Sequence, residues 1–252
     1  MMTKRTIAAA ALFALGAPLA QADGFGGLDI ARSHDVNFTG APKGSPKTAE
    51  NITVYSGHLG NYWPSADARS ALILKADVAL ARLDRFSVLD NETYGLGFGG
   101  YHSFSPANSM NALVGASTRR FEDRNRNLNV YFAQLGFKQN AAESFWVREG
   151  VLLEKGVERT NANNYSGYGL NASLNWSPAR ATVLMLGMGR NVRVYDVQVA
   201  DRRTSDQLTL GAVQQLGEHL YLRAGASRQA NKTNAGNRYD TTVYTVGIGA
   251  SF

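Results

Sequence analysis

The chain has 252 residues, of which 44% are hydrophobic and 18% charged, and it contains no cysteine. The lack of cysteine excludes disulfide bonds and metal sites built on thiolates, and we expect no cofactor. With 26 basic and 20 acidic residues the formal net charge is +6, which is too mild to predict a nucleic-acid partner.

The first 22 residues have the composition of a secretory signal peptide. A Lys-Arg pair precedes an apolar run at 7–19, and small residues stand at the cleavage spacing up to Ala22. The run is shorter than the ~20 apolar residues that a transmembrane helix needs. We therefore predict a signal peptide at 1–22, cleaved after Ala22, and a single mature domain at 23–252.

No later apolar run approaches the length of a membrane helix, so an exported chain of this kind could enter a membrane only as a closed barrel. Such a barrel needs alternating segments of ~10 residues, joined by short turns and long loops in alternation. The sequence predicts an all-β, closed, antiparallel up-and-down transmembrane β-barrel of about twelve strands. The predicted strands lie near 26–38, 49–62, 69–86, 92–104, 109–120, 127–138, 144–157, 164–176, 181–193, 204–215, 219–230 and 239–252.

The alternation is clear in several of these segments. In 167–176 the residues Tyr168, Leu170, Leu174 and Trp176 share one parity, whereas the other parity is small or polar. In 26–38 and 144–157 a charge falls on either parity, so the register there stays open. The prolines beyond the signal peptide all fall between predicted strands, as ladder hydrogen bonds require. The short connections are expected in the periplasm and the long ones outside the cell.

Aromatic residues cluster near the short turns and predict a girdle at the depth of the lipid headgroups. The alternative is that aromatic residues flank turns in any β protein. The predicted girdle consists of Trp63, Phe104, Trp146, Trp176 and Phe252.

The final segment, YTVGIGASF (244–252), alternates apolar and small residues and ends on Phe252. It looks like the C-terminal strand by which the barrel assembly machinery recognises outer-membrane barrels of Gram-negative bacteria. We expect it to pair with the first strand in the outer membrane. The arginine-rich segment TRRFEDRNRN (118–127) is expected to be solvated or to pair with lipopolysaccharide phosphates, beside the outer-membrane lipid.

Charged residues on the non-lipid parity predict the character of the lumen, because a charge facing lipid near the midplane costs a few kcal/mol. They are Lys75, Asp77, Arg119, Arg148, Glu154 and Arg223, with Arg190 or Arg193 as a further member. Two interpretations stay open. Pairs such as Lys75 with Asp77 and Arg148 with Glu154 could plug the interior, or the arginines could line a pore that favours anions.

The chain is not expected to be an enzyme. Its four histidines offer only His102 beside Ser103 as a candidate pair, and no third group completes a triad. The segment GLGFGG (95–100) matches a dinucleotide pattern but lacks its strand–turn–helix context. Glycines there are better explained as lumenal positions that leave space.

Three segments carry a resemblance to a known family. SHDVNFTGAPKG (33–44), ADRRTSDQLTLGAVQQL (200–216) and NAGNRYDTTVYTVGIGASF (234–252) resemble the barrel domain of surface lipoprotein assembly modifiers. That resemblance implies a barrel that helps to deliver a periplasmic or surface protein cargo to the cell surface. The chain differs because its signal peptide runs directly into the barrel, without the family's helical-repeat domain.

The leading functional hypothesis is a porin-like channel for small polar or anionic solutes. The alternatives are a translocation or assembly accessory barrel and a structural or adhesive barrel with a plugged lumen. A soluble periplasmic β protein is the non-membrane alternative.

Overall fold

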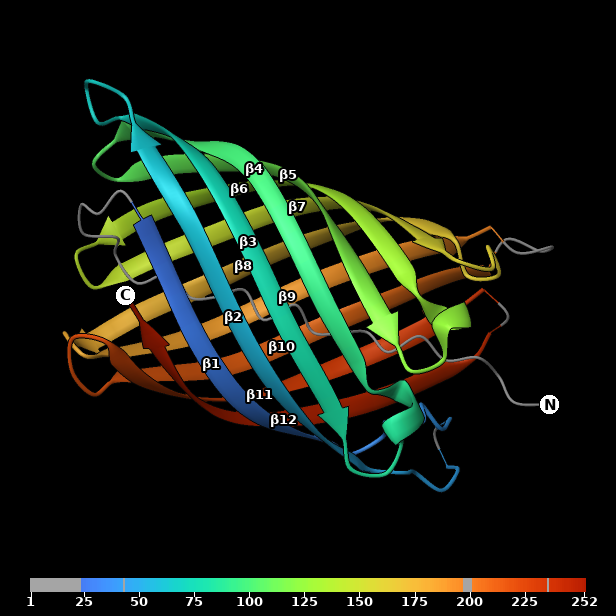
Figure 1. The fold of residues 1–252 in the computed structure, drawn as a ribbon. Coiled ribbons are helices and arrows are strands. Elements are labelled where there is room, and N and C mark those ends of the chain that lie inside the picture. The colour runs from blue at the N-terminus through green and yellow to red at the C-terminus, as the bar shows by residue number, and fades with distance from the viewer. Residues whose placement is uncertain (1–23, 43, 197–200, 235) are drawn as a thin grey trace.

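Twelve antiparallel strands close into one barrel, in which each strand pairs with its neighbours in the chain and β1 pairs with β12 (Figure 1). The computed structural model describes residues 24–42, 44–196, 201–234 and 236–252, so the predicted signal peptide lies outside the described residues. The strands are β1 (Gly24–Asp35), β2 (Glu50–Pro64), β3 (Ser70–Leu83), β4 (Asn91–Ser105), β5 (Asn108–Phe121), β6 (Leu128–Ala142), β7 (Phe145–Glu158), β8 (Tyr165–Ala179), β9 (Thr182–Tyr195), β10 (Asp201–Gln215), β11 (Leu220–Thr233) and β12 (Arg238–Ser251).

The fold class and all twelve predicted strands are confirmed, with shifts at their ends. The largest shift is in β6, which was predicted to end at 138 and continues to Ala142. β3 stops at Leu83, before its predicted end, and a 3-10 helix (Ser87–Leu89) forms in the following loop. Two prolines were wrongly placed outside the strands. Pro64 is the last residue of β2, and Pro178 lies in β8 where the register shifts between Trp176 and Ala179, so neither interrupts a regular ladder.

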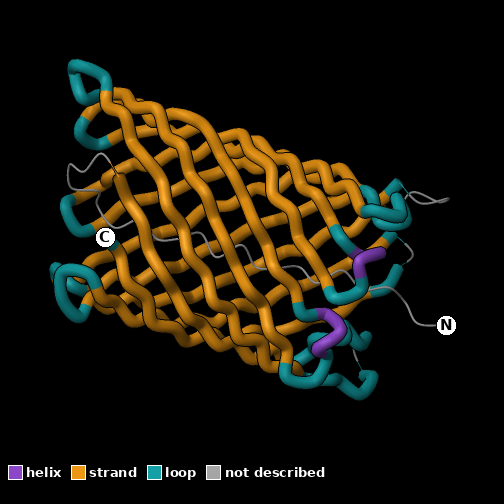
Figure 2. The backbone as a smooth tube through the Cα atoms, in the orientation of Figure 1, coloured by secondary structure: helices purple, strands orange, loops and turns teal. Residues whose placement is uncertain are grey.

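The two ends of the barrel differ. Short turns and the C-terminus lie at one end, called here the turn end, and longer connections lie at the other, the loop end (Figure 1). Both 3-10 helices, Ser87–Leu89 and Arg124–Arg126, lie at the loop end (Figure 2). Among the described residues no helix is long and apolar enough to cross a membrane.

Alternate residues of each strand turn an apolar face outward. Leu28 and Ile30 of β1 are exposed, and they lie beside Gly57 and Tyr55 of β2, which share the outward parity. The same parity continues around the wall and exposes the apolar residues Leu59, Leu72, Leu74, Val78, Leu96, Phe98, Val114, Tyr131, Val151, Leu153, Leu170, Leu174, Leu186, Met188, Leu208, Leu210, Leu222, Val246 and Ile248. A closed barrel with such an exterior is suited to hydrocarbon surroundings, because all of its strands are paired.

The barrel is closed by β1 and β12. Their register runs from Gly27 opposite Ser251 to Asp35 opposite Val243. Beyond it, Gly26 and Phe252 exchange two backbone hydrogen bonds of 2.7 and 3.0 Å. The predicted pairing of the last strand with the first is therefore confirmed, and the phenylalanine belongs to the seam.

Buried polar side chains fasten the connections at the loop end. The Glu50 carboxylate accepts hydrogen bonds from the backbone N–H groups of Arg85 and Phe86, at 3.1 and 3.2 Å. Asn37 bonds the backbone of Ala41 in both directions and donates to the Asp240 carbonyl. These residues hold the loops against the barrel rim, since buried polar groups are satisfied by such partners.

Four members of the predicted girdle project outward at the turn end. Trp63, Phe104, Trp176 and Phe252 are exposed by 45%, 56%, 49% and 64%. Trp146 differs: its register partners are Asn140 and Asn175, on the inward parity, and it faces the lumen. Phe145, on the opposite parity of β7, takes the outward position instead.

Candidate lumenal site

The structure places all six predicted lumenal charges, Lys75, Asp77, Arg119, Arg148, Glu154 and Arg223, on the inward parity of their strands. Arg193 is also inward, whereas Arg190 is outward and pairs with the outward Asp206 at 2.6 Å. The sequence analysis missed further inward charges. These are Asp29, Asp35, Glu50, Lys138, Glu158, Asp201 and Arg203. Their role in conduction stays a prediction.

A charged and aromatic cluster occupies the half of the lumen nearer the loop end. Glu154 of β7 accepts a hydrogen bond from Nε of Arg193 at 2.5 Å, and the Arg193 guanidinium stacks 4.6 Å from the Tyr165 ring centre. Arg119 of β5 extends toward Glu154 and Arg193 and interacts with both electrostatically. Glu154 neutralises Arg193, with which it is in direct contact, and Arg119 leaves the cluster with one cation in excess.

The expected pair between Arg148 and Glu154 is wrong. Glu154 lies in the half of β7 nearer the loop end and pairs with Arg193 of β9, whereas Arg148 lies near the turn end of the same strand. Residues of one strand that are several positions apart cannot meet, because an extended chain rises ~3.3 Å per residue. The expected pair of Lys75 with Asp77 is present, at 2.8 Å.

A second compensated pair lies near the turn end of the lumen, on β1 and β11. The Arg223 guanidinium donates to the Asp29 carboxylate, and the Tyr221 hydroxyl donates to the other oxygen of Asp29 at 3.3 Å. Their side chains are largely buried, with exposures of 18% for Arg223 and 12% for Asp29. Arg223 is therefore tied to the wall and is a weaker candidate for solute contact than its charge alone suggested.

Three lumenal cations form no ion pair with a carboxylate among the described residues: Arg119 of β5, Lys138 of β6 and Arg148 of β7. Lys138 and Arg148 lie directly opposite each other in the ladder, near the turn end. The Lys138 ammonium lies 5.6 Å from the Trp146 ring centre. These two residues therefore form an uncompensated positive pair near the turn end of the described lumen.

Between the charged groups, several inward positions on β9 to β11 are small. Gly187, Thr209, Gly211, Gly225 and Ser227 lie on the inward parity of three adjacent strands. A Cβ built on Gly187 would meet its nearest atom, Cβ of Thr209, at 3.7 Å, which is an ordinary contact. This part of the wall therefore leaves space in the lumen.

The histidines do not form a catalytic group in the described structure. His102 Nδ1 lies 2.8 Å from the Ser70 hydroxyl, on the outward face, and its neighbour Ser103 is inward and bonds the Ser105 carbonyl. His34 is bonded to Asn51 at 2.8 Å. Among the described residues, no group of three or more His, Asp or Glu side chains could hold a metal ion.

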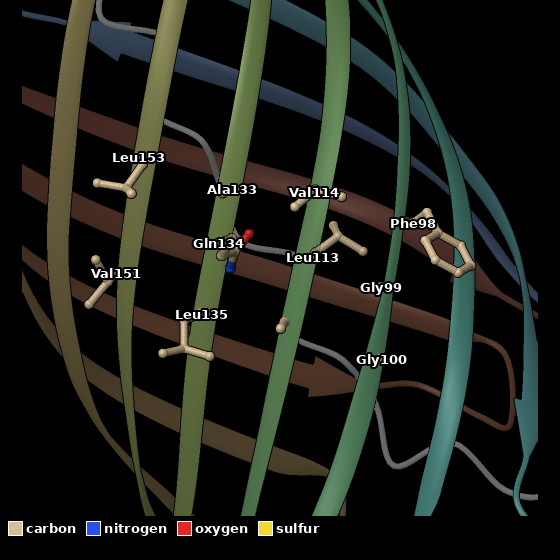
Figure 3. Close-up of a pocket in the computed structure, with 11 residues that line it drawn as sticks. Phe98, Gly99, Gly100, Leu113, Val114, Ala133, Gln134, Leu135, Val151 and Leu153 are labelled. Atoms are coloured by element: carbon tan, nitrogen blue, oxygen red, sulfur yellow. The ribbon is translucent and has the colours of Figure 1, made fainter.

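A shallow apolar groove of about 490 Å³ lies on the outer wall, over β4 to β7 (Figure 3). Small residues such as Ala112 and Ala133 form its floor, and Phe98, Val114 and Leu153 flank it. These flanking side chains have the outward parity, so the groove belongs to the exterior and not to the lumen.

Comparison with solved structures supports the architecture. The fold is similar to that of the COG4313 outer membrane channel from Pseudomonas putida F1, with a TM-score of 0.71 and 14% identity over 92% of this chain and 97% of that chain. It is also similar to the DcaP outer membrane channel of Acinetobacter baumannii (TM-score 0.51, 8% identity, 91% and 96% covered). The translocator domain of the autotransporter NalP from Neisseria meningitidis is similar as well (TM-score 0.53, 12% identity, 92% and 90% covered).

No protein-family model matches the sequence, and neither does any curated protein. Likeness at these identities shows the barrel fold. The fold that the resemblance to surface lipoprotein assembly modifiers implied is confirmed, whereas membership of that family stays a prediction.

Proposed function

We propose that the protein is an outer-membrane channel of the porin type, which passes small polar solutes and favours anions. The observation that carries the proposal is the group of small lumenal residues on β9 to β11. A barrel of this strand number can enclose a narrow aqueous path. The similarity in fold to two outer membrane channels supports the same function.

The preference for anions is proposed from the way in which the lumenal charges are paired. Glu154, Asp29 and Asp77 each contact a cation. The inward carboxylates at the loop-end rim accept hydrogen bonds from neutral groups; they are Asp35, Glu50 and Glu158. Deeper in the lumen, toward the turn end, Lys138 and Arg148 have no carboxylate partner among the described residues. Fixed cations that are not neutralised attract anions into a narrow low-dielectric path.

The location is part of the proposal. Signal-peptide cleavage after Ala22 would export the chain, and the last strand would be recognised by the barrel assembly machinery. The turn end would face the periplasm and the loop end the outside. Outward arginines near the loop end, such as Arg32 and Arg228, would lie at the depth of lipopolysaccharide phosphates, to which arginine binds well.

Single-channel recording in planar bilayers tests the proposal. Protein purified from membranes is expected to give a steady conductance, with a reversal potential in a salt gradient that shows anion selectivity. Arg148→Ala should reduce the selectivity, and the outward Lys155→Ala on the same strand should not. Heat-modifiable migration on a gel would show that each variant is folded. Absence of conductance from folded protein would contradict the proposal and favour a plugged structural or adhesive barrel.

Translocation is the second candidate, supported by the similarity in fold to the NalP translocator domain. The Glu154–Arg193 cluster would then have to separate during passage of a polypeptide. A strain that lacks the protein should show reduced surface display of a cargo protein, and normal display would contradict this candidate. That the chain is not an enzyme stays a prediction.

A further inference from the structure

Lys138 and Arg148 project from adjacent strands into the same part of the lumen. Their backbones are direct register partners in the β6–β7 ladder, so their side chains leave the wall side by side. Their positive charges repel each other. Like charges directly opposite one another on a sheet are destabilising, and no carboxylate of the described residues offsets them.

The neighbouring positions are neutral and able to form hydrogen bonds. Ser109 is opposite Lys138 on β5, and Ser173 is opposite Arg148 on β8. One inward position farther from the turn end, two asparagine side chains lie over glycines. The Asn111 amide oxygen lies 2.5 Å from where a Cβ of Gly136 would be, and the Asn171 amide oxygen lies 2.8 Å from where a Cβ of Gly150 would be. The two glycines thus make room for carboxamides above the cations.

Two buried polar atoms beside the cations are unsatisfied. The indole Nε1 of Trp146 and Oδ1 of Asn175 have no hydrogen-bond partner, and Asn175 is fully buried. Trp146 and Asn175 are direct register partners across β7 and β8. Unsatisfied buried groups are rare in folded proteins, and the indole N–H beside an uncompensated pair of cations is a donor suited to an anion. The Asn175 oxygen is an acceptor and is suited to a hydroxyl or a water molecule.

We propose that Lys138, Arg148 and the Trp146 indole form a subsite that binds the carboxylate group of a small organic acid near the turn end of the lumen. The inference rests on the proposed channel function, for which it names the class of solute. The planar guanidinium of Arg148 matches the two oxygens of a carboxylate. The Lys138 ammonium and the indole N–H supply further donors, and the serines and asparagines accommodate polar substituents.

A titration that does not depend on conduction tests the subsite. The chain has three tryptophans, so Trp63→Phe with Trp176→Phe leaves Trp146 as the only indole fluorophore in the folded protein. Succinate is the carboxylate probe, with chloride at equal ionic strength as the baseline and inorganic phosphate as the competing oxyanion. We expect a saturable change of Trp146 fluorescence with succinate, and weaker binding of phosphate.

In this background, Lys138→Gln and Arg148→Gln should each weaken succinate binding by about tenfold or more, since each removes a charge-assisted hydrogen bond. Arg148→Lys should weaken it less, because the charge remains and only the planar fork is lost. Lys155→Gln, an exposed cation on the outward face of the same strand, is the matched control and should leave binding unchanged.

The outcomes separate the subsite from the channel. Saturable succinate binding that depends on both cations supports the subsite, even if the barrel does not conduct. No saturable change in folded protein overturns it, even if the barrel conducts. Equal binding of phosphate and succinate overturns the assignment to carboxylates. A loss of binding in Lys155→Gln as large as in Arg148→Gln overturns the assignment to the lumen.

Discussion

Glu154 of β7 and Arg193 of β9 form an ion pair of 2.5 Å across the strand that separates them. The intervening residue on β8 is Gly167, which is the register partner of both. A Cβ there would lie 3.1 Å from Cγ of Arg193 and 3.3 Å from Oε1 of Glu154. The pair therefore forms because the strand between its members carries no side chain at that position.

Replacement of Glu154 by Gln should destabilise the barrel, because the Arg193 guanidinium would lose its anionic partner in a largely buried site. The side chains are exposed by only 27% for Arg193 and 10% for Glu154. We expect the free energy of unfolding to fall by about 3 kcal/mol, measured by urea titration in lipid vesicles. Glu143→Gln, at an exposed turn, is the control, and an equal loss in both variants would contradict the role of the pair.

A large side chain at position 187 should obstruct the lumen. The built Cβ of Gly187 has only ordinary contacts, so Gly187→Ala should fold and conduct normally. Gly187→Trp adds an indole that extends into the lumen, and we expect single-channel conductance to fall to roughly half or less. An unchanged conductance in the tryptophan variant would show that this wall does not line the conducting path.

A charge introduced at two adjacent residues of β10 should have unequal effects on the stability of the barrel. Leu210 is 58% exposed on the outward face, and Thr209 is inward. Leu210→Arg should lower the free energy of unfolding by about 2 kcal/mol or more, since it places a guanidinium in lipid. Thr209→Arg should have a much smaller effect on stability. Urea titrations in vesicles measure both, and equal losses would argue against a lipid-covered exterior.

The turn at 65–69 should show a pH dependence of its own. The Ser65 hydroxyl donates to the Asp67 carboxylate at 2.6 Å, and the Arg69 N–H donates to it at 3.0 Å. These bonds, first that from Ser65, lower the pKa of Asp67 below its ordinary value. Because the folded-state pKa is depressed, the stabilisation of the turn is present above the unfolded-state pKa of about 3.9. It is lost as the pH falls through the folded-state value.

An NMR titration of the Asp67 carboxyl carbon measures this directly. Its midpoint should lie below that of an unstructured aspartate, and Ser65→Ala should raise the pKa toward the ordinary value. A midpoint that does not change in the serine variant would show that the hydroxyl bond is absent in solution.

The strands could be predicted because an apolar exterior and a polar interior impose a two-residue period on each of them. What a single strand cannot show is which residue its neighbour places alongside. Lys138 was the last residue of its predicted strand, and its proximity to Arg148 follows from the β6–β7 register. Trp146 was misplaced for a different reason: it shares the parity of the inward Arg148, so regular alternation along β7 already turns it toward the lumen and Phe145 outward. The Glu154–Arg193 pair depends on three strands at once.

The β1–β12 seam has a consequence for how the barrel assembles. Every other pairing joins consecutive strands, so each hairpin can form once its own short stretch of chain is available. The seam joins residues near position 26 to Phe252, and contacts so distant in the chain carry the largest loop-closure entropy and form slowly. Until the final strand arrives, both edges of the curved sheet expose unpaired backbone groups, which are prone to pair with other chains. Removing β12 would therefore leave eleven strands able to form hairpins but without a partner for β1, and the sheet would remain open and liable to aggregate.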